Sequence, residues 1–215
     1  MAAAKPSHSR PEMENLAYRE SLLAEHPIIT RGYTIATPMI EACYQVFRER
    51  VWLRRRGTVL YADTCTGKTT CSEAVEALLC MEFPNIYLAS VDAQKSLGIR
   101  SFLKDLIDAC GLALSGRETA MAMGEILLMG VQTECDKRKG NHFVLIIDEM
   151  QNLQEDEFTQ LATLGNRLHR RHISMTTLGF AQPDITHLMK GFLASRKRNL
   201  VARFLAEQII FEGCQ

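Results

Sequence analysis

The segment TVLYADTCTGKT, residues 58–69, joins a short run of β-branched and aromatic residues to a loop that ends in Gly-Lys-Thr. Residues 58–62 have the composition of a buried strand. From Ala62 to Thr69 the spacing is A-x-x-x-x-G-K-T, the pattern of a phosphate-binding loop with alanine at the first glycine position. A helical pattern follows over residues 69–82. The segment therefore predicts the strand, loop and helix that form the nucleotide site of a P-loop NTPase.

Each residue type in this loop has a chemical role. Backbone N–H groups surround the phosphates, Gly67 allows their close approach, Lys68 reaches the β and γ oxygens, and the Thr69 hydroxyl binds Mg²⁺. We therefore expect ATP and Mg²⁺ as cofactors, with Lys68 also acting in catalysis. A carboxylate at Asp63 must point away from the polyphosphate. The expected ATP-binding residues are Ala62, Asp63, Thr64, Cys65, Thr66, Gly67, Lys68, Thr69 and Thr70.

A second motif follows the apolar run at residues 142–147, where Asp148 and Glu149 come directly after a predicted central strand. Such a pair is common at strand ends, but downstream of a phosphate-binding loop it matches the Walker B motif. We expect Asp148 to hold Mg²⁺ and Glu149 to polarise the attacking water.

Strand and helix patterns alternate along the chain, which predicts an α/β fold with a parallel sheet covered by helices on both faces. We expect a tail and short helix at residues 1–25 and a P-loop ATPase core at 26–215. The expected strands are 58–62, 85–91, 142–147, 173–178 and 207–211, and the expected helices are 12–25, 38–56, 69–82, 98–110, 118–138, 155–171 and 184–193.

Composition limits the possible partners and compartments. The 25 basic residues balance the 25 acidic ones, so any DNA contact needs a local basic patch. The 7 cysteines include no C-x-x-C pair and are typical of free thiols in a reducing compartment. The start of the chain has no apolar signal region, and no run reaches the roughly 20 apolar residues of a membrane span. We expect a cytoplasmic protein without membrane contact.

Several segments resemble one family. Asp148-Glu-Met-Gln151 resembles the Asp-Glu-Ala-Gln form of AAA+ ATPases of DNA transposition. The stretch ISMTTLGFAQPD, residues 173–184, resembles that family's fourth strand and the turn after it, and Leu200-Val-Ala-Arg-Phe204 resembles its Leu-x-x-Arg-Phe stretch. Over residues 26–212 the chain is thus similar to the TniB/TnsC group, which is related to the target-capture ATPase of phage Mu.

The resemblance implies an AAA+ type P-loop NTPase with a parallel five-stranded sheet, in the bacterial cytosol. It further implies slow, assembly-dependent ATP hydrolysis by a homo-oligomer, either a ring or a helical filament, on double-stranded DNA of any sequence. The implied role is to recruit or activate a transposase at the target site, with a target-selection protein as a further candidate partner. Since the sequence ends just past the fifth expected strand, we expect the helical lid to be missing or minimal.

The resemblance also implies roles for individual residues. An arginine of one subunit completes the neighbour's site, and Arg203 matches best, with Arg196 and Arg198 as rivals. A solvated charge run explains residues 195–198 equally well. Polar residues at the end of the fourth strand sense the γ-phosphate; Thr177 and Gln182 are the candidates, and a strand-end hydroxyl and a turn amide are the plain alternative.

In the initiator-like branch of AAA+ proteins the segment after the second strand faces the central pore. The expected DNA-binding residues there are Lys95, Ser96, Arg100 and Lys104. Cations among small polar residues suit phosphate contacts without base recognition. A helix cap with surface lysines is an equal alternative. A nucleotide-gated adaptor that binds protein partners with little hydrolysis is therefore the competing hypothesis to the DNA-assembled ATPase.

Overall fold

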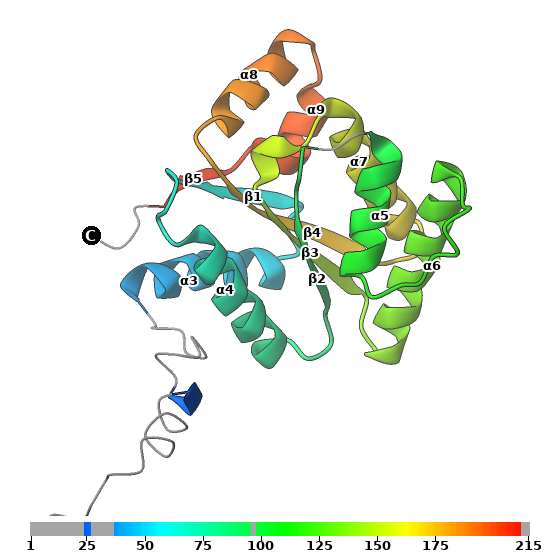
Figure 1. Ribbon diagram of the computed structural model, residues 1–215, viewed down its shortest axis with the longest axis horizontal. Coiled ribbons are helices and arrows are strands. Elements are labelled where there is room, and N and C mark those ends of the chain that lie inside the picture. Colours follow the sequence, from blue (N-terminus) through cyan, green and yellow to red (C-terminus); the bar gives the residue numbers. More distant parts are fainter. Residues whose placement is uncertain (1–23, 27–36, 96–97, 212–215) are drawn as a thin grey trace, which may run out of the picture. The chain divides into compact units, whose positions relative to one another are not determined.

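Five parallel strands form one sheet in the computed structural model, in the order β2-β3-β4-β1-β5 (Figure 1). The strands are β1 (Gly57–Tyr61), β2 (Tyr87–Asp92), β3 (His142–Asp148), β4 (Ser174–Ala181) and β5 (Gln208–Ile210). Each neighbouring pair runs parallel. Strand β4 thus lies between β1, which precedes the predicted phosphate-binding loop, and β3, which ends at Asp148. This order confirms the expected parallel α/β fold.

The structure describes residues 24–26, 37–95 and 98–211. The chain divides into two units, residues 1–35 and 36–215, and the account below concerns the second. The expected tail at 1–11 and most of the expected helix at 12–25 lie outside the described residues, as does the segment from Pro27 to Tyr33. No helix in the described ranges is long and apolar enough to cross a membrane.

Two helices cover one face of the sheet, α3 (Pro38–Trp52) and α4 (Lys68–Glu82) (Figure 1). Helix α3 begins as the sequence predicts, because the Thr37 hydroxyl accepts from the Ile40 N–H at 3.3 Å and proline occupies the first position. Phe47 is fully buried and meets Phe180 of β4 edge to face, with ring centroids 5.3 Å apart. Burying one phenylalanine contributes about 1.5–3 kcal/mol, so this pair is a main attachment of the helix.

Helix α3 is shorter than expected. The sequence predicted a helix to residue 56, whereas the structure ends it at Trp52. Arg54 adopts a left-handed conformation with φ of 52°, which turns the chain out of the helix and toward β1. Three consecutive arginines look helical by propensity, but here they form the connection to the sheet.

The opposite face is covered by α5 (Ile99–Ala109), α6 (Ala120–Lys137), α7 (Glu155–His169), α8 (Ile185–Ala194) and the short α9 (Arg198–Leu200) (Figure 1). A π-helical turn, Val201–Leu205, connects α9 to β5. All seven residues of β3 are buried, as expected for a strand with helices on both faces.

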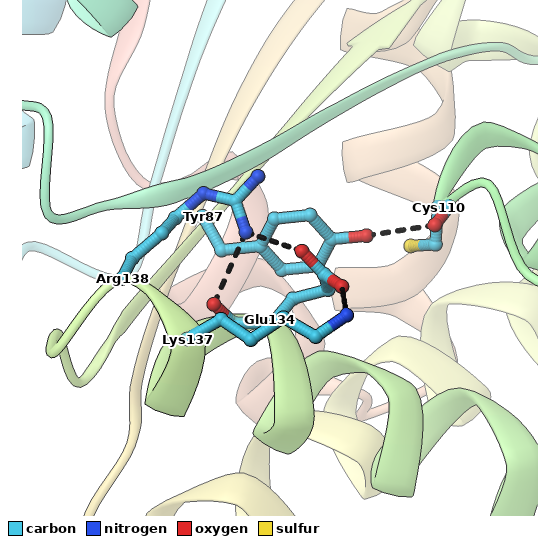
Figure 2. Close-up of polar contacts among 5 residues, drawn as sticks. All are labelled: Tyr87, Cys110, Glu134, Lys137 and Arg138. Atoms are coloured by element: carbon cyan, nitrogen blue, oxygen red, sulfur yellow. Dashed lines mark hydrogen bonds and ion pairs between the residues drawn. The ribbon is translucent and has the colours of Figure 1, made fainter.

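At the sheet edge, Tyr87 ties β2 to the ends of two helices (Figure 2). Its hydroxyl donates to the Cys110 carbonyl oxygen at 3.0 Å, just after α5. The Arg138 guanidinium lies 4.9 Å from the ring centroid, and Arg138 pairs in turn with Glu134 of α6. Glu134 also binds Lys137 at 2.7 Å. Burial, the first cause, raises the pKa of Tyr87, so the phenol stays a hydrogen-bond donor at every physiological pH.

Candidate nucleotide-binding site

The predicted loop lies at the carboxyl edge of the sheet, between the end of β1 and the start of α4. Ala62 is buried, at 5% exposure, in the core between the sheet and α3–α4, and its N–H donates to the Ala181 carbonyl at 3.1 Å. The methyl group therefore has a packing role at the position where the motif commonly has glycine. Two residues of the loop are left-handed, Cys65 with φ of 61° and Gly67 with φ of 85°.

The Lys68 ammonium is held inside the curve of the loop. Its Nζ donates to the Ala62 carbonyl at 3.0 Å and to the Asp63 carbonyl at 2.6 Å, and the residue is only 6% exposed. Thr66 Oγ1 donates to the same Asp63 carbonyl at 2.9 Å. Asp63 itself is exposed, so it turns its carbonyl, and not its carboxylate, toward the lysine. The loop thus encloses a positive charge beside the positive N-terminal end of α4, an arrangement suited to phosphates.

Two oxygen ligands for Mg²⁺ meet next to the loop. Thr69 Oγ1 donates to Asp148 Oδ2 at 2.9 Å, although the two residues are far apart in sequence. The other carboxylate oxygen of Asp148 accepts from the Glu149 N–H at 2.9 Å. A hydroxyl and a carboxylate fit Mg²⁺, which is usually bound by one or two protein oxygens together with substrate phosphates and water. The described residues contain no cluster of three or more metal-ligating side chains, and such a Mg²⁺ site needs none.

Glu149 is fixed by amide groups from two directions. Its Oε2 accepts from Gln151 Nε2 at 2.5 Å and from Gln182 Nε2 at 2.8 Å. The Gln182 N–H donates to Gln151 Oε1 at 2.9 Å, which closes the triangle. Gln182 directly follows β4, so the strand order brings it between the loop and Glu149. The predicted sensor candidate Gln182 thus lies at the site, and Gln151 joins it.

Asp92 is an acidic residue beside the site that the sequence motifs did not identify. It ends β2 and pairs in register with Asp148. Partial burial and the charges of Asp148 and Glu149 raise its pKa. The signal that identifies it is its position, because the carboxyl ends of parallel strands meet at one edge of a sheet.

The prediction that Thr177 is a γ-phosphate sensor is wrong about its position. Thr177 lies opposite Gly57, at the start of β1, and its N–H donates to the Arg56 carbonyl at 2.8 Å. Gln182 lies five positions further along the chain, which is roughly 16 Å at the usual rise of a strand. The strand continues to Ala181, past the end predicted at residue 178.

Of the three arginine candidates, Arg203 lies at the end of the sheet opposite to its own chain's loop. Arg203 is in the turn that packs on the start of β1, where a side chain at Gly57 would meet the Arg203 carbonyl. Its guanidinium donates to the Ala162 carbonyl at 2.6 Å and to Asn166 Oδ1 at 2.7 Å. Arg196 and Arg198 are exposed, and within the described residues their side chains make no hydrogen bond or ion pair. A role for any of them in a neighbour's site stays a prediction.

The predicted DNA-binding residues lie on and before α5. Lys95, Arg100 and Lys104 are exposed, and Ser96 lies outside the described residues. Arg100 donates to the Gly116 carbonyl at 3.1 Å. Arg100 and Lys104 border a hollow that is also lined by Asp108 and Glu118, so this surface carries both signs of charge. The DNA contact remains a prediction.

The sheet order, the loop around Lys68 and the adjoining Asp148-Glu149 define a P-loop NTPase of the AAA+ type. A family model described as "AAA domain" matches residues 53–189, and the chain belongs to this family. No curated protein matches the sequence.

Several solved structures share the fold of this chain. The Aeropyrum pernix ORC2 protein (ADPNP–ADP complexes) matches with a TM-score of 0.61 and 12% identity, over 83% of this chain and 48% of that one. The A. pernix ORC1 protein in complex with DNA matches with a TM-score of 0.60 and 16% identity, over 84% of this chain and 47% of that one. Cdc6p from Pyrobaculum aerophilum matches with a TM-score of 0.59 and 16% identity, over 83% of this chain and 46% of that one. The chain thus spans about half the length of these structures, and at such identities the likeness concerns the fold.

The position of Lys68 predicts that its charge is needed for ATP binding. Replacing Lys68 with alanine removes the ammonium that would contact two phosphates, and hydrogen bonds to charged groups contribute about 1.5–3 kcal/mol each. We expect calorimetric titration with MgATP to show at least about a 100-fold loss of affinity. Lys190→Ala, on the exposed side of α8, is the matched control and should bind as the parent does. Equal affinity of the two variants would contradict the assignment of the loop.

Proposed function

We propose that this chain is an ATP-hydrolysing switch that assembles on double-stranded DNA and regulates DNA transposition. The observation that carries the proposal is the carboxylate of Glu149, held beside the Thr69–Asp148 pair by amides that follow β3 and β4. A site for nucleotide binding alone needs the loop and the Mg²⁺ ligands. A second carboxylate at this place is what water activation needs.

The proposed mechanism assigns one task to each side chain. Lys68 neutralises charge on the β and γ phosphates, and Thr69 and Asp148 would hold Mg²⁺, which would supply positive charge to the phosphate oxygens. Glu149 accepts the proton of the attacking water. While its Oε2 accepts two hydrogen bonds, the carboxylate is fixed in place and the lone pairs of that oxygen are occupied.

Gln182 then links phosphate sensing to this base. Its amide can donate either to Glu149, as in this structure at 2.8 Å, or to a γ-phosphate oxygen in the loop beside it. Donation to the phosphate releases one of the two bonds to Glu149 and frees a lone pair of Oε2 to accept the proton of the attacking water. Hydrolysis is thereby coupled to the presence of the third phosphate.

Assembly on DNA is supported by sequence and by likeness. Exposed cations follow the second strand at Lys95, Arg100 and Lys104. Because the chain has no net charge, binding to DNA phosphates needs such a local group of cations. The A. pernix ORC1 protein, which shares the fold, was solved in complex with DNA. A homo-oligomer, as a ring or helical filament, is the proposed DNA-bound form.

Transposition is the most specific part of the proposal. It rests on the Asp148-Glu-Met-Gln151 and Leu200-Val-Ala-Arg-Phe204 segments, while the family match extends only to the AAA domain. The proposed partners are a transposase, bound to or activated by the ATP-bound assembly, and a target-selection protein. Such a switch would work in the bacterial cytosol.

Glu149→Gln tests the hydrolytic role. The amide keeps an oxygen that can accept from Gln182 but cannot take a proton, so ATP should still bind while turnover falls by about 10²–10⁴-fold. Phosphate release and calorimetric titration measure the two effects separately. Glu73→Gln, on the exposed side of α4, is the control and should keep both. Normal turnover in Glu149→Gln would refute the assignment of the base.

The DNA surface is tested by replacing Lys95, Arg100 and Lys104 with glutamine. Binding to two unrelated duplexes should weaken alike, and the slope of log affinity against log salt should fall by about 0.9 for each lost phosphate contact. Fluorescence anisotropy over a salt series gives both values. The control triple variant, Lys139→Gln with Arg170→Gln and Lys190→Gln, changes the same charge at other exposed positions. If the parent binds no DNA at all, the nucleotide-gated adaptor becomes the better hypothesis.

The arginine that would complete a neighbour's site is tested by mixing subunits. Separate alanine variants of Arg203, Arg196 and Arg198 should keep ATP binding, and the variant that lacks the true contact should lose turnover. Mixing that variant with Lys68→Ala should restore part of the activity, because one interface then pairs an intact loop with an intact arginine. If all three variants keep full, concentration-dependent turnover, none of them is the contact.

A further inference from the structure

A second concave site lies at the end of the sheet opposite to the nucleotide loop. It is a cavity of about 230 Å³ between the start of β4, helix α7 and the π-helical turn before β5. Its wall includes Arg56, Thr177 and Arg203, none of which contacts the residues of the nucleotide site. We call it the arginine pocket. Its volume is below the 300–1,000 Å³ usual for drug-sized ligands, so it would take a smaller molecule than a nucleotide.

A buried hydroxyl without a partner lies in its wall. Thr177 is 2% exposed, and in the described part of the chain its Oγ1 has no hydrogen-bond partner. Because side chains alternate along a strand, Thr177 shares with Met175 the face of β4 that packs on α7. The next residue, Thr176, is the contrast: it faces the other way and its hydroxyl is 2.9 Å from His142 Nε2. Buried hydroxyls without a partner are rare and costly, so Thr177 needs an explanation.

The wall carries positive charge without an acidic group. Arg54, Arg56 and Arg203 line the pocket, and none of the described residues around it is acidic. Burial and then the charge of Arg56 lower the pKa of Arg203, as expected for cations that share a site without a counter-ion. Arg203 and Arg54 are already hydrogen-bonded to protein oxygens. The Arg56 guanidinium makes no hydrogen bond or ion pair within the described ranges, so all its donors are available.

The remainder of the wall is partly apolar, with Asn166, His169 and Ser174 as its other polar residues. Leu161, Ile173 and Phe204 are buried side chains that line the same space. Inorganic phosphate has no apolar surface that could pack against these side chains. A carboxylate on a short hydrocarbon body meets every condition: its oxygens accept from Arg56 and from the Thr177 hydroxyl, and its chain covers the apolar wall.

We propose that the arginine pocket binds a small aliphatic monocarboxylate, with Arg56 and Thr177 as its polar contacts. This site is separate from the nucleotide loop and does not depend on the function proposed above. It gives a role to an unpaired hydroxyl and an unpaired guanidinium that the nucleotide chemistry does not use.

Valerate, a five-carbon carboxylate, is the probe, and amide chemical shifts in a ¹⁵N spectrum of the full chain are the measurement. We expect saturable shifts at residues of the pocket with a dissociation constant on the order of 1 mM, since a ligand of a few atoms binds no tighter than this without many contacts. Pentanol, with the same chain and no charge, and inorganic phosphate, with charge and no chain, should each bind at least about 10-fold more weakly. Equal binding of phosphate or pentanol would overturn the proposed ligand class.

Two variants and their matched controls locate the site. Arg56→Gln should weaken valerate binding by about 10-fold or more, whereas Arg170→Gln, which removes a nearby exposed charge outside the pocket, should not. Thr177→Val should weaken it by about 2–10-fold without lowering the melting temperature, because the hydroxyl it removes has no partner in the ligand-free chain. Thr176→Val should lower the melting temperature and leave valerate binding unchanged, since it removes the contact with His142. All variants should bind MgATP as the parent does. Unchanged valerate affinity in Arg56→Gln and Thr177→Val, or shifts centred on the nucleotide loop, would refute the proposal.

Discussion

Strand β4 pairs with β1 along one side and with β3 along the other, and this double pairing positions the groups of the nucleotide site. It sets the separation between the loop that follows β1 and the acidic pair that follows β3. It also determines which residue can lie between them. Gln182 reaches Glu149 because it is the first residue after β4, and Thr69 reaches Asp148 because α4 begins directly above the same edge. The parallel direction of all the strands brings these four ends together.

The two ends of the sheet have opposite electrostatic character. Asp92, Asp148 and Glu149 gather at the carboxyl edge, where Lys68 is the balancing cation. Arg54, Arg56 and Arg203 gather around the other end without an acidic partner in the pocket they share. Beside the pocket, Glu207 pairs with Arg50 and Arg55, so the absence of an acidic group concerns the pocket itself.

The sequence predicted most of the fold because its signals are local. The loop pattern, the apolar run of β3 and the Thr37-Pro38 helix start each depend on neighbouring residues, and each lies where it was expected. The chemistry of Lys68, Thr69, Asp148 and Glu149 followed from the same motifs, and their proximity in the structure agrees with it.

The errors arose where packing overrides a local signal. The fourth strand was predicted to end at residue 178, just before Gly179, which made Thr177 look like a strand end. In the fold this glycine is inside β4, and a Cβ added there would meet the sulfur of Met150. The contacts of Gln151 with Gln182, and of Asp92 with Asp148, depend on strand order and register, which a single sequence does not reveal. The arginine pocket was equally hidden, since its wall comes from segments far apart in the chain.

Ala62 and Gly67 give the two ends of the phosphate-binding loop different freedom to move. Ala62 is anchored in the core, and its N–H is bonded to β4. Gly67 has open space where a side chain would be, and its left-handed backbone has few steric limits. The first end of the loop is therefore held by the sheet, whereas the second end is held by Lys68, whose ammonium donates back to the Ala62 and Asp63 carbonyls.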